Sequence, residues 1–467
     1  MAAHRILGEH AVVLGGSMAG LVAARVLSDH YRRVTLVERD RFPDGPLTRK
    51  GVPQIRHVHV LLKRGEVVLD GLFPGLLDEL VQGGAHSIDM AGDTRWHHYG
   101  GWKVRFRSGM QFHCQSRPYL EWKVRARVAA TSGVEIADGC DALGLVLDAE
   151  GTKIAGLRIR DADGDERTLA ADLVVDASGR GSRTPHWLES LGFCSPRESR
   201  VGVDVGYASR LYRPPAGTGR SWKALFIYHQ APGTRLAVIV PVENDLWMVT
   251  EVGWFRDYPP GDEQGFLDFA RSLPEPDVYE AIRNAEPCSP IAVHRFPYNL
   301  RRHYERLGSM PAGLVVLGDA FCSFNPIYGQ GMTSAALGAA TLGDILKETG
   351  GDGRKESRLD TIGRRFHSRF GRILDGVWMQ TTSEDLRFPQ AEGKRAWWLG
   401  LANAYTARVY ELSRTDPVVS RAFLEVMHLM QPPISLLRPA IARRVLFAGL
   451  ARKTSETGEV RYVDLAQ

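Results

Sequence analysis

A chain of 467 residues has the length of about three domains, and 44% hydrophobic with 24% charged residues is the composition of an ordinary folded protein, which excludes wholesale disorder. The formal charge of +5 favours anionic small molecules or phosphates without demanding a nucleic-acid partner. The five cysteines are scattered without a C-x-x-C pair, the start carries no secretory signal, and no uncharged run reaches about 18 apolar residues. We therefore expect a cytoplasmic protein with no membrane span, no disulfide framework and no metal site.

The first predicted unit is a strand, a glycine-rich turn, a helix and a second strand, over residues 11–14, 15–20, 21–27 and 34–37. Gly15 permits the tight turn and Gly20 the close approach of helix to strand, whereas Ser17 stands where the strict G-x-G-x-x-G pattern has its middle glycine. Glu38 follows the second strand, where a carboxylate can accept hydrogen bonds from ribose hydroxyls. This unit predicts a dinucleotide site with contacts from Gly15, Ser17, Met18, Ala19, Gly20, Glu38 and Arg39.

Beyond this unit, short helices alternate with strand-rich segments. Helices are predicted over residues 64–72, 75–81, 116–125, 265–272 and 277–285. Strands are predicted within residues 96–112, 146–160, 164–171, 173–176, 201–254 and 314–317. A helix of small residues is predicted over 331–346, a linker over 350–354, and a largely helical region with breaks at prolines over 359–452.

Three further stretches carry nucleotide-binding patterns. They are RKGVPQIRHVHVLL at 49–62, DLVVDASGRGSR at 172–183 and GLVVLGDAFCSFNPIYGQGM at 313–332. With them, over roughly residues 10–348, the chain resembles the class A flavin monooxygenases, which share the fold of para-hydroxybenzoate hydroxylase. Within that group it is similar to bacterial epoxidases and hydroxylases of secondary metabolism, including antibiotic biosynthesis, that act on polyketide polyenes.

The resemblance implies an α/β fold. A Rossmann-like FAD-binding domain of the glutathione reductase type would carry an inserted β-sheet-rich substrate domain and a C-terminal helical region. Because the nucleotide-binding stretches recur along the chain, we expect a discontinuous FAD-binding domain over residues 1–75, 101–189 and 291–349. Residues 76–100 and 190–290 are assigned to the substrate domain, and 350–467 to the helical region.

The resemblance also places residues beside the flavin. The Asp319 carboxylate would accept a hydrogen bond from a ribitol hydroxyl of FAD. The neighbours of the flavin ring, at a helix N-terminus, would be Pro326, Gly329, Gly331 and Met332. No side chain is assigned a catalytic role, because the flavin itself would carry the chemistry.

Two arginines are candidates for the FAD phosphates, since the family supplies one from each of the corresponding regions. They are Arg49 and Arg117. A surface ion pair between Arg117 and Glu121, one helical turn away, is the alternative interpretation.

Two other motifs leave alternatives open. His57 and His59 could share one face of a strand as metal ligands do, but no third ligand stands nearby, so packing or hydrogen bonds to the cofactor loop are expected. The Asp176–Gly179 stretch reads D-A-S-G where the hydroxylases commonly have an Asp-Gly pair, which argues against tight direct binding of NAD(P)H. The D-A-S-G form also occurs in flavin halogenases and geranylgeranyl reductases, so it does not choose the reaction.

Aromatic residues on the predicted strands are candidates for an apolar substrate cavity. We expect it to be lined by Trp222, Phe226, Tyr228 and Trp247, with ordinary core packing as the alternative for each. The basic and apolar stretch 434–453 could touch a membrane, although a helix packed on the cofactor domain is the preferred interpretation.

The resemblance therefore implies a FAD-dependent monooxygenase. One oxygen atom from O2 would be inserted through a flavin hydroperoxide, by epoxidation or hydroxylation, into a large apolar polyketide-like or aromatic molecule. Electrons would come from NAD(P)H or from reduced flavin made by a partner reductase. The alternative is a [4+2]-type cyclase in which FAD is structural and the cavity holds a reactive conformer. A flavin halogenase is weaker, because its W-x-W-x-I-P signature is absent.

Overall fold

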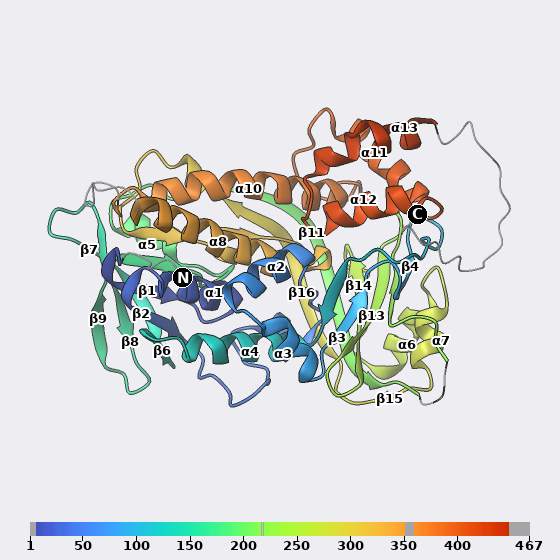
Figure 1. Cartoon of the computed structure of the whole chain (residues 1–467), viewed down its shortest axis with the longest axis horizontal. Coiled ribbons are helices and arrows are strands. Elements are labelled where there is room, and N and C mark those ends of the chain that lie inside the picture. Colours follow the sequence, from blue (N-terminus) through green and yellow to red (C-terminus); the bar gives the residue numbers. More distant parts are fainter. Residues whose placement is uncertain (1–5, 216, 218, 351–358, 448–467) are drawn as a thin grey trace.

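The computed structural model describes residues 6–447, except 216, 218 and 351–358. Its first layer is a five-stranded parallel sheet in the order β17–β10–β1–β2–β6 (Figure 1). The strands are β1 (Gly8–Leu14), β2 (Tyr31–Glu38), β6 (Val134–Asp138), β10 (Leu173–Asp176) and β17 (Leu314–Val316). Ala11 to Val13 are fully buried, as expected for a central strand of a parallel sheet covered on both faces. The predicted Rossmann-like α/β fold is confirmed.

Helices from distant parts of the chain pack around this sheet. They are α1 (Met18–Leu27), α2 (Lys63–Leu72), α3 (Leu76–Gln82), α4 (Arg117–Ala129), α5 (Thr184–Ser190), α8 (Gln330–Gly350) and α10 (Ile362–Asp385). Helix α1 contacts α2, α4 and α8, and α10 contacts α8 and β17. Thus the first helix of the predicted C-terminal region packs beside the parallel sheet.

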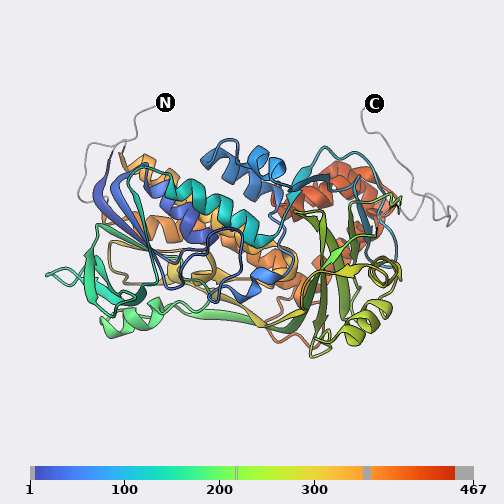
Figure 2. The same ribbon diagram turned by 90° about the horizontal axis from the view of Figure 1, so that it is seen from below.

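The second layer is an eight-stranded sheet in the order β18–β16–β11–β14–β13–β12–β4, with β15 paired to β11. Its strands are β4 (Thr94–His97), β11 (Glu198–Arg213), β12 (Ala224–Ile227), β13 (Arg235–Val242), β14 (Leu246–Trp254), β15 (Glu286–Pro287), β16 (Ala292–Arg302) and β18 (Cys322–Ser323). Helices α6 (Glu263–Arg271) and α7 (Asp277–Ile282) cover one face with their own apolar cluster. The two sheets lie toward opposite ends of the molecule (Figure 2).

The other face of this sheet is covered by helices late in the chain. They are α11 (Leu399–Leu412), α12 (Pro417–Met427), α13 (Pro439–Phe447) and the 3-10 turn η5 (Pro433–Leu437). Figure 1 shows α11, α12 and α13 grouped at one end of the molecule. Two of the predicted proline breaks are helix starts, at Pro417 and Pro433, where proline's missing N–H costs no hydrogen bond. The linker prediction at 350–354 falls almost wholly outside the described residues.

Two small sheets complete the described structure. They are β3 (His86–Asp89) with β5 (Gln111–Cys114), and β7 (Asp141–Leu147) with β8 (Ile154–Arg160) and β9 (Glu166–Ala170). The prediction of strands within 96–112 holds only at the two ends of that range, because residues 98–110 between β4 and β5 form no strand. Among the helices of the described ranges, none has the length and hydropathy to cross a membrane. The domain limits stay a prediction.

Candidate cofactor and substrate site

The turn between β1 and α1 requires two of its glycines. Gly15 has a φ of +102°, and a Cβ there would lie 2.5 Å from the carbonyl oxygen of Ala177. A Cβ on Gly20 would lie 1.7 Å from the carbonyl oxygen of Gly15. The turn therefore brings β10 and the start of α1 together, with Ser17 as the residue before the helix.

Four side chains form an arginine cluster beside this turn: Ser17, Arg49, Arg117 and Glu121. Glu121 Oε1 accepts from Arg49 Nε at 3.0 Å, and Glu121 Oε2 pairs with Arg117 Nη2 at 2.9 Å. Ser17 Oγ donates to Glu121 at 2.9 Å and accepts from Arg117 Nη2 at 2.9 Å. The structure thus brings the two predicted phosphate ligands together. The ion pair between Arg117 and Glu121 exists, but it is buried rather than on the surface.

The cluster fits a diphosphate. Arg49 Nη2 and Arg117 Nη1 are buried, and each has no hydrogen-bond partner among the described residues. A buried guanidinium nitrogen without an acceptor is costly, and phosphate oxygens match two such donors well. Burial lowers the pKa of Arg117, whereas Glu121 and Glu38 outweigh burial and raise that of Arg49. Both side chains remain cationic.

Glu38 braces the glycine-rich turn. Its Oε2 accepts from the backbone N–H of Gly16 at 2.7 Å, its Oε1 from the N–H of Asp40 at 3.0 Å, and Arg49 Nη1 lies 3.2 Å from Oε2. A contact to ribose hydroxyls stays a prediction. Arg39 is exposed, and among the described residues no hydrogen bond or ion pair joins it to the arginine cluster.

Asp319 lies beside the start of α8. It follows β17 in a 3-10 turn opened by Gly318, whose φ is +64° and whose Cβ, if present, would lie 2.8 Å from Ala19 Cβ on α1. A Cβ on Gly331 would lie 3.8 Å from Asp319 Oδ1. Burial raises the pKa of Asp319 to about 6, against the opposing charges of Arg180 and Arg117. The Gly-Asp motif therefore lies near the arginine cluster.

A second turn runs from Pro326 to Gln330 into α8, and because the sequence predicts that the flavin ring lies beside it, it is here called the flavin-side turn. Asp385 holds it in place from the end of α10. Asp385 Oδ1 accepts from Asn325 Nδ2 and from the Tyr328 hydroxyl, each at 2.9 Å, and Oδ2 accepts from Asn299 Nδ2 at 2.7 Å. Asp385 is fully buried, and burial raises its pKa to about 6. Gly331 and Met332 follow the turn in the first turn of α8.

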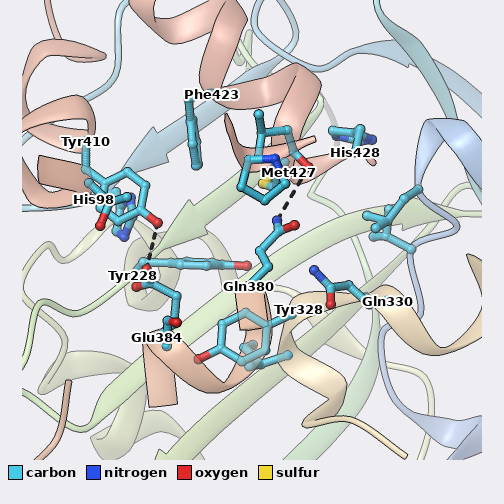
Figure 3. A pocket seen from close by; sticks show the side chains of 18 of the residues that line it. His98, Tyr228, Tyr328, Gln330, Gln380, Glu384, Tyr410, Phe423, Met427 and His428 are labelled. Carbon is cyan, nitrogen blue, oxygen red and sulfur yellow. Dashed lines mark hydrogen bonds between the residues drawn. The ribbon is translucent and has the colours of Figure 1, made fainter. Parts of the chain in front are cut away.

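A cavity of about 800 Å³ extends from this turn (Figure 3). One wall is the flavin-side turn and another is the eight-stranded sheet, through Phe226, Tyr228, Val238 and Thr250. The third wall comes from α10 to α13 and includes Gln380, Trp398, Leu401, Tyr410, Phe423, Met427, His428, Ile434, Leu437 and Leu446. No local sequence pattern had indicated this third wall. The described part of 434–453 packs over the eight-stranded sheet, so the expectation that it packs on the cofactor domain was wrong for it.

Two of the four predicted cavity aromatics are in place and two are not. Phe226 and Tyr228 line the cavity. Trp222 and Trp247 instead stack on each other, with centroids 5.6 Å apart, within the apolar cluster beneath α6 and α7. The reason is strand alternation, because Trp247 lies on the face of β14 opposite to that of Thr250.

Among the polar side chains that line the cavity, His428 and Gln380 each have an unused hydrogen-bonding atom. His428 Nδ1 accepts from the backbone N–H of Lys63 at 3.1 Å, and burial lowers the pKa of His428 to about 4. The neutral ring therefore carries its proton on Nε2, which is buried and without a partner among the described residues. Gln380 Nε2 donates to the Val426 carbonyl at 3.4 Å, which leaves its Oε1 as a second buried atom without a partner.

The remaining motifs have local partners. His57 Nδ1 lies 2.8 Å from Ser209 Oγ, and His59 Nδ1 donates to the His57 carbonyl at 2.8 Å. Burial lowers the pKa of His57 to about 3 and that of His59 to about 4. No group of three or more histidine, cysteine or acidic residues among the described residues could hold a metal ion. Asp176 accepts from Ser178 N at 2.9 Å and from Ser178 Oγ at 2.6 Å, which closes its own turn.

Comparisons with known proteins agree with this geometry. The profile of a family described as FAD dependent oxidoreductase matches residues 11–183. Protein Rv3254 of Mycobacterium tuberculosis is 33% identical over 461 residues, which cover 94% of each chain. The chain belongs to the FAD-dependent oxidoreductases. A kynurenine 3-monooxygenase of Salinispora tropica is 27% identical to this oxidoreductase over 372 residues, 72% of each chain. A flavoprotein/dehydrogenase of Cytophaga hutchinsonii has the same fold, with a TM-score of 0.66, 16% identity, and coverage of 94% of this chain and 98% of that one.

Proposed function

We propose that this FAD-dependent oxidoreductase is a monooxygenase that inserts one atom of O2 into a large apolar molecule of polyketide-like or aromatic type. The observation that carries the proposal is the cavity of about 800 Å³ that reaches the flavin-side turn. Its volume is that of a pocket for a multi-ring ligand. The similarity to kynurenine 3-monooxygenase supports the reaction class.

The cofactor would be held by groups from four parts of the chain. Arg49 and Arg117 would bind the diphosphate, Glu38 the ribose and Asp319 the ribitol, and the N–H groups at the start of α8 would face the flavin ring. FAD would supply the reaction with O2 once it is reduced. NAD(P)H or a partner reductase would supply the electrons.

The protein's own contribution would be to orient the substrate and exclude water. Phe226, Tyr228 and Phe423 give the cavity flat apolar surfaces against which a planar or polyene substrate can lie. Water excluded from such a cavity cannot divert the reacting oxygen. Epoxidation and hydroxylation need the same cavity and differ in the substrate carbon that lies nearest the flavin.

The experiment is oxygen labelling with purified, FAD-loaded enzyme. It is reduced with NADH, NADPH or dithionite without air and then mixed with 18O2 and a panel of polyenes and polycyclic phenols. We expect one 18O atom in the product of at least one panel member and return of the oxidised flavin spectrum. A product that is an isomer of its substrate, formed under nitrogen with oxidised flavin, would establish the cyclase instead.

A further inference from the structure

Large apolar side chains gather on the outer surface of the C-terminal helices. They lie on or beside the neighbouring elements α11, η5 and α13 and are here called the rim: Trp397, Trp398, Leu401, Ile434, Leu437, Leu446 and Phe447. Trp397 is 94% exposed and Leu401 78% exposed. Most of the large apolar side chains that the described residues expose belong to the rim. A soluble monomer rarely concentrates exposed apolar side chains in this way without a contact for them to make.

The rim is continuous with the cavity. Trp398, Leu401, Ile434, Leu437 and Leu446 are exposed to solvent and also line the cavity. An apolar molecule that enters or leaves at this place therefore crosses an apolar surface. The helices that carry the rim, α11 and α13, lie at the end of the molecule away from the parallel sheet (Figure 1).

Basic residues accompany the rim. Lys394 and Arg395 precede its tryptophans, and Arg438, Arg443 and Arg444 are exposed among its later members. Residues 432–447 contain no acidic residue. Few acidic residues accompany these basic ones. Glu392 precedes Lys394 and Arg395 in the sequence, and Asp416 forms an ion pair with Arg444 at 2.7 Å. Exposed tryptophan with arginine and lysine around an apolar patch is the pattern of a protein surface that rests in the headgroup layer of a membrane.

We propose that the rim docks on an anionic lipid surface, so that an apolar substrate passes between the bilayer and the cavity. A second copy of the chain fits the rim less well. A symmetric contact would bring the same arginines of both copies together across the interface, and like charges there oppose association. Anionic headgroups instead neutralise these arginines. The passage of a substrate rests on the proposed function, whereas docking itself does not depend on the reaction that the cavity performs.

Vesicle binding of the full-length, FAD-loaded protein tests the proposal. We expect sedimentation with phosphatidylcholine vesicles that contain phosphatidylglycerol, weaker sedimentation with pure phosphatidylcholine, and loss of binding at high salt. In the double variant Trp397→Glu/Phe447→Glu, which changes two exposed rim residues outside the cavity lining, binding should fall at least about tenfold while the flavin spectrum stays unchanged. Val293→Glu is the matched control, because Val293 is 62% exposed on β16 and is not part of the rim; it should bind as the wild type does.

Three results would overturn the proposal. The first is no binding of the wild type to anionic vesicles. The second is equal binding by the rim variant and the wild type. The third is a dimer, seen by sedimentation equilibrium in the absence of lipid, that the rim variant abolishes, since the rim would then be an interface between copies.

Discussion

The carboxylate of Glu121 forms ion pairs with both Arg49 and Arg117. These ion pairs hold the arginine cluster in place in the absence of phosphate. The Glu121 side chain is 3% exposed, and each carboxylate oxygen has a different arginine as partner. Burial alone would raise the pKa of Glu121, but Arg117 and Arg49 outweigh burial and keep it low. Glu38 and Asp40 also lie 3.2 Å from Arg49 Nη1, so the cluster offers a diphosphate no net positive charge but two unused donors, Arg49 Nη2 and Arg117 Nη1.

At Asp319 we predict a loss of FAD retention. Asp319→Ala removes an acceptor that a charge-assisted hydrogen bond to a polyol would use, and the dissociation constant for FAD should rise about 10- to 100-fold. Asp344→Ala, on the exposed side of α8, is the matched control and should bind FAD normally. Equilibrium dialysis with flavin fluorescence gives both constants. Equal affinity in the two variants would contradict the placement of the ribitol.

At His428 we predict a change in ligand preference. The wild type should bind 1-naphthol more tightly than naphthalene, because the Nε2–H of His428 can donate to the hydroxyl. His428→Phe should reduce that preference about tenfold. His428→Gln can accept from Lys63 N–H and still donate to the ligand, so it should keep much of the preference. Changes in the flavin spectrum on titration measure all three. An unchanged ratio in His428→Phe would show that His428 does not contact the ligand.

At the scale of elements, α10 matters because its last residue fixes the flavin-side turn. Asp385 accepts three hydrogen bonds from Asn299, Asn325 and Tyr328, which join α10 to β16 and to the segment before α8. The Tyr207 hydroxyl also donates to Asn325 Oδ1 at 2.8 Å, so β11 is tied to the same point. The turn is therefore positioned by residues from three other elements.

The raised pKa of Asp385 predicts a pH dependence of stability. Its pKa rises from 3.8 to about 6, so the folded state binds this proton more tightly than the unfolded state. The free energy of unfolding should therefore decrease as the pH rises from about 4 to about 6, by up to about 3 kcal/mol from this residue. Asp385→Asn removes the titrating group and should flatten that part of the profile. Urea unfolding at several pH values measures the slope, and an identical slope in the variant would exclude Asp385 as its source.

The sequence indicated those parts of the site whose signal is local. Gly15, Gly20 and Asp319 could be placed because each lies in a short pattern of strand, turn and helix. Asp385 and His428 could not, because they lie on helices without such a pattern and reach the site only through tertiary packing. Trp247 was misplaced for a different reason. Its face depends on the register of β14 with β13, which aromatic content does not reveal.

For the whole molecule, the apolar clusters separate the predicted cofactor site from the cavity. One cluster fills the space around the parallel sheet, and two others lie on the two faces of the eight-stranded sheet. Most of the predicted FAD contacts come from the turn after β1, from α1, β2 and α4, from the turn after β17 and from α8, which lie within the first cluster or border it. A ligand that joins so many elements should stabilise them together.

Removal of FAD should therefore lower the thermal midpoint. A ligand that binds only the folded state adds about 2.7 kcal/mol at 100 times its dissociation constant, which corresponds to roughly 5–10 °C for domains of this size. Melts of the apoprotein at increasing FAD should show the midpoint rising with the logarithm of concentration, whereas riboflavin, which lacks the diphosphate, should have a much smaller effect. A midpoint insensitive to FAD would contradict a site that spans these elements.

The third wall of the cavity, which comes from α10 to α13, determines what a truncated chain can still do. A polypeptide interrupted just before Trp398 would keep the arginine cluster, Asp319 and Asp385, and could therefore take on colour. It would lack α11 to α13, so water would reach the flavin-side turn freely. Such a product would bind FAD without a closed substrate cavity, and electrons from its reduced flavin would be lost to the solvent. The yellow colour of a preparation therefore shows that the part of the chain predicted to bind FAD is folded. It does not show that the substrate cavity is closed.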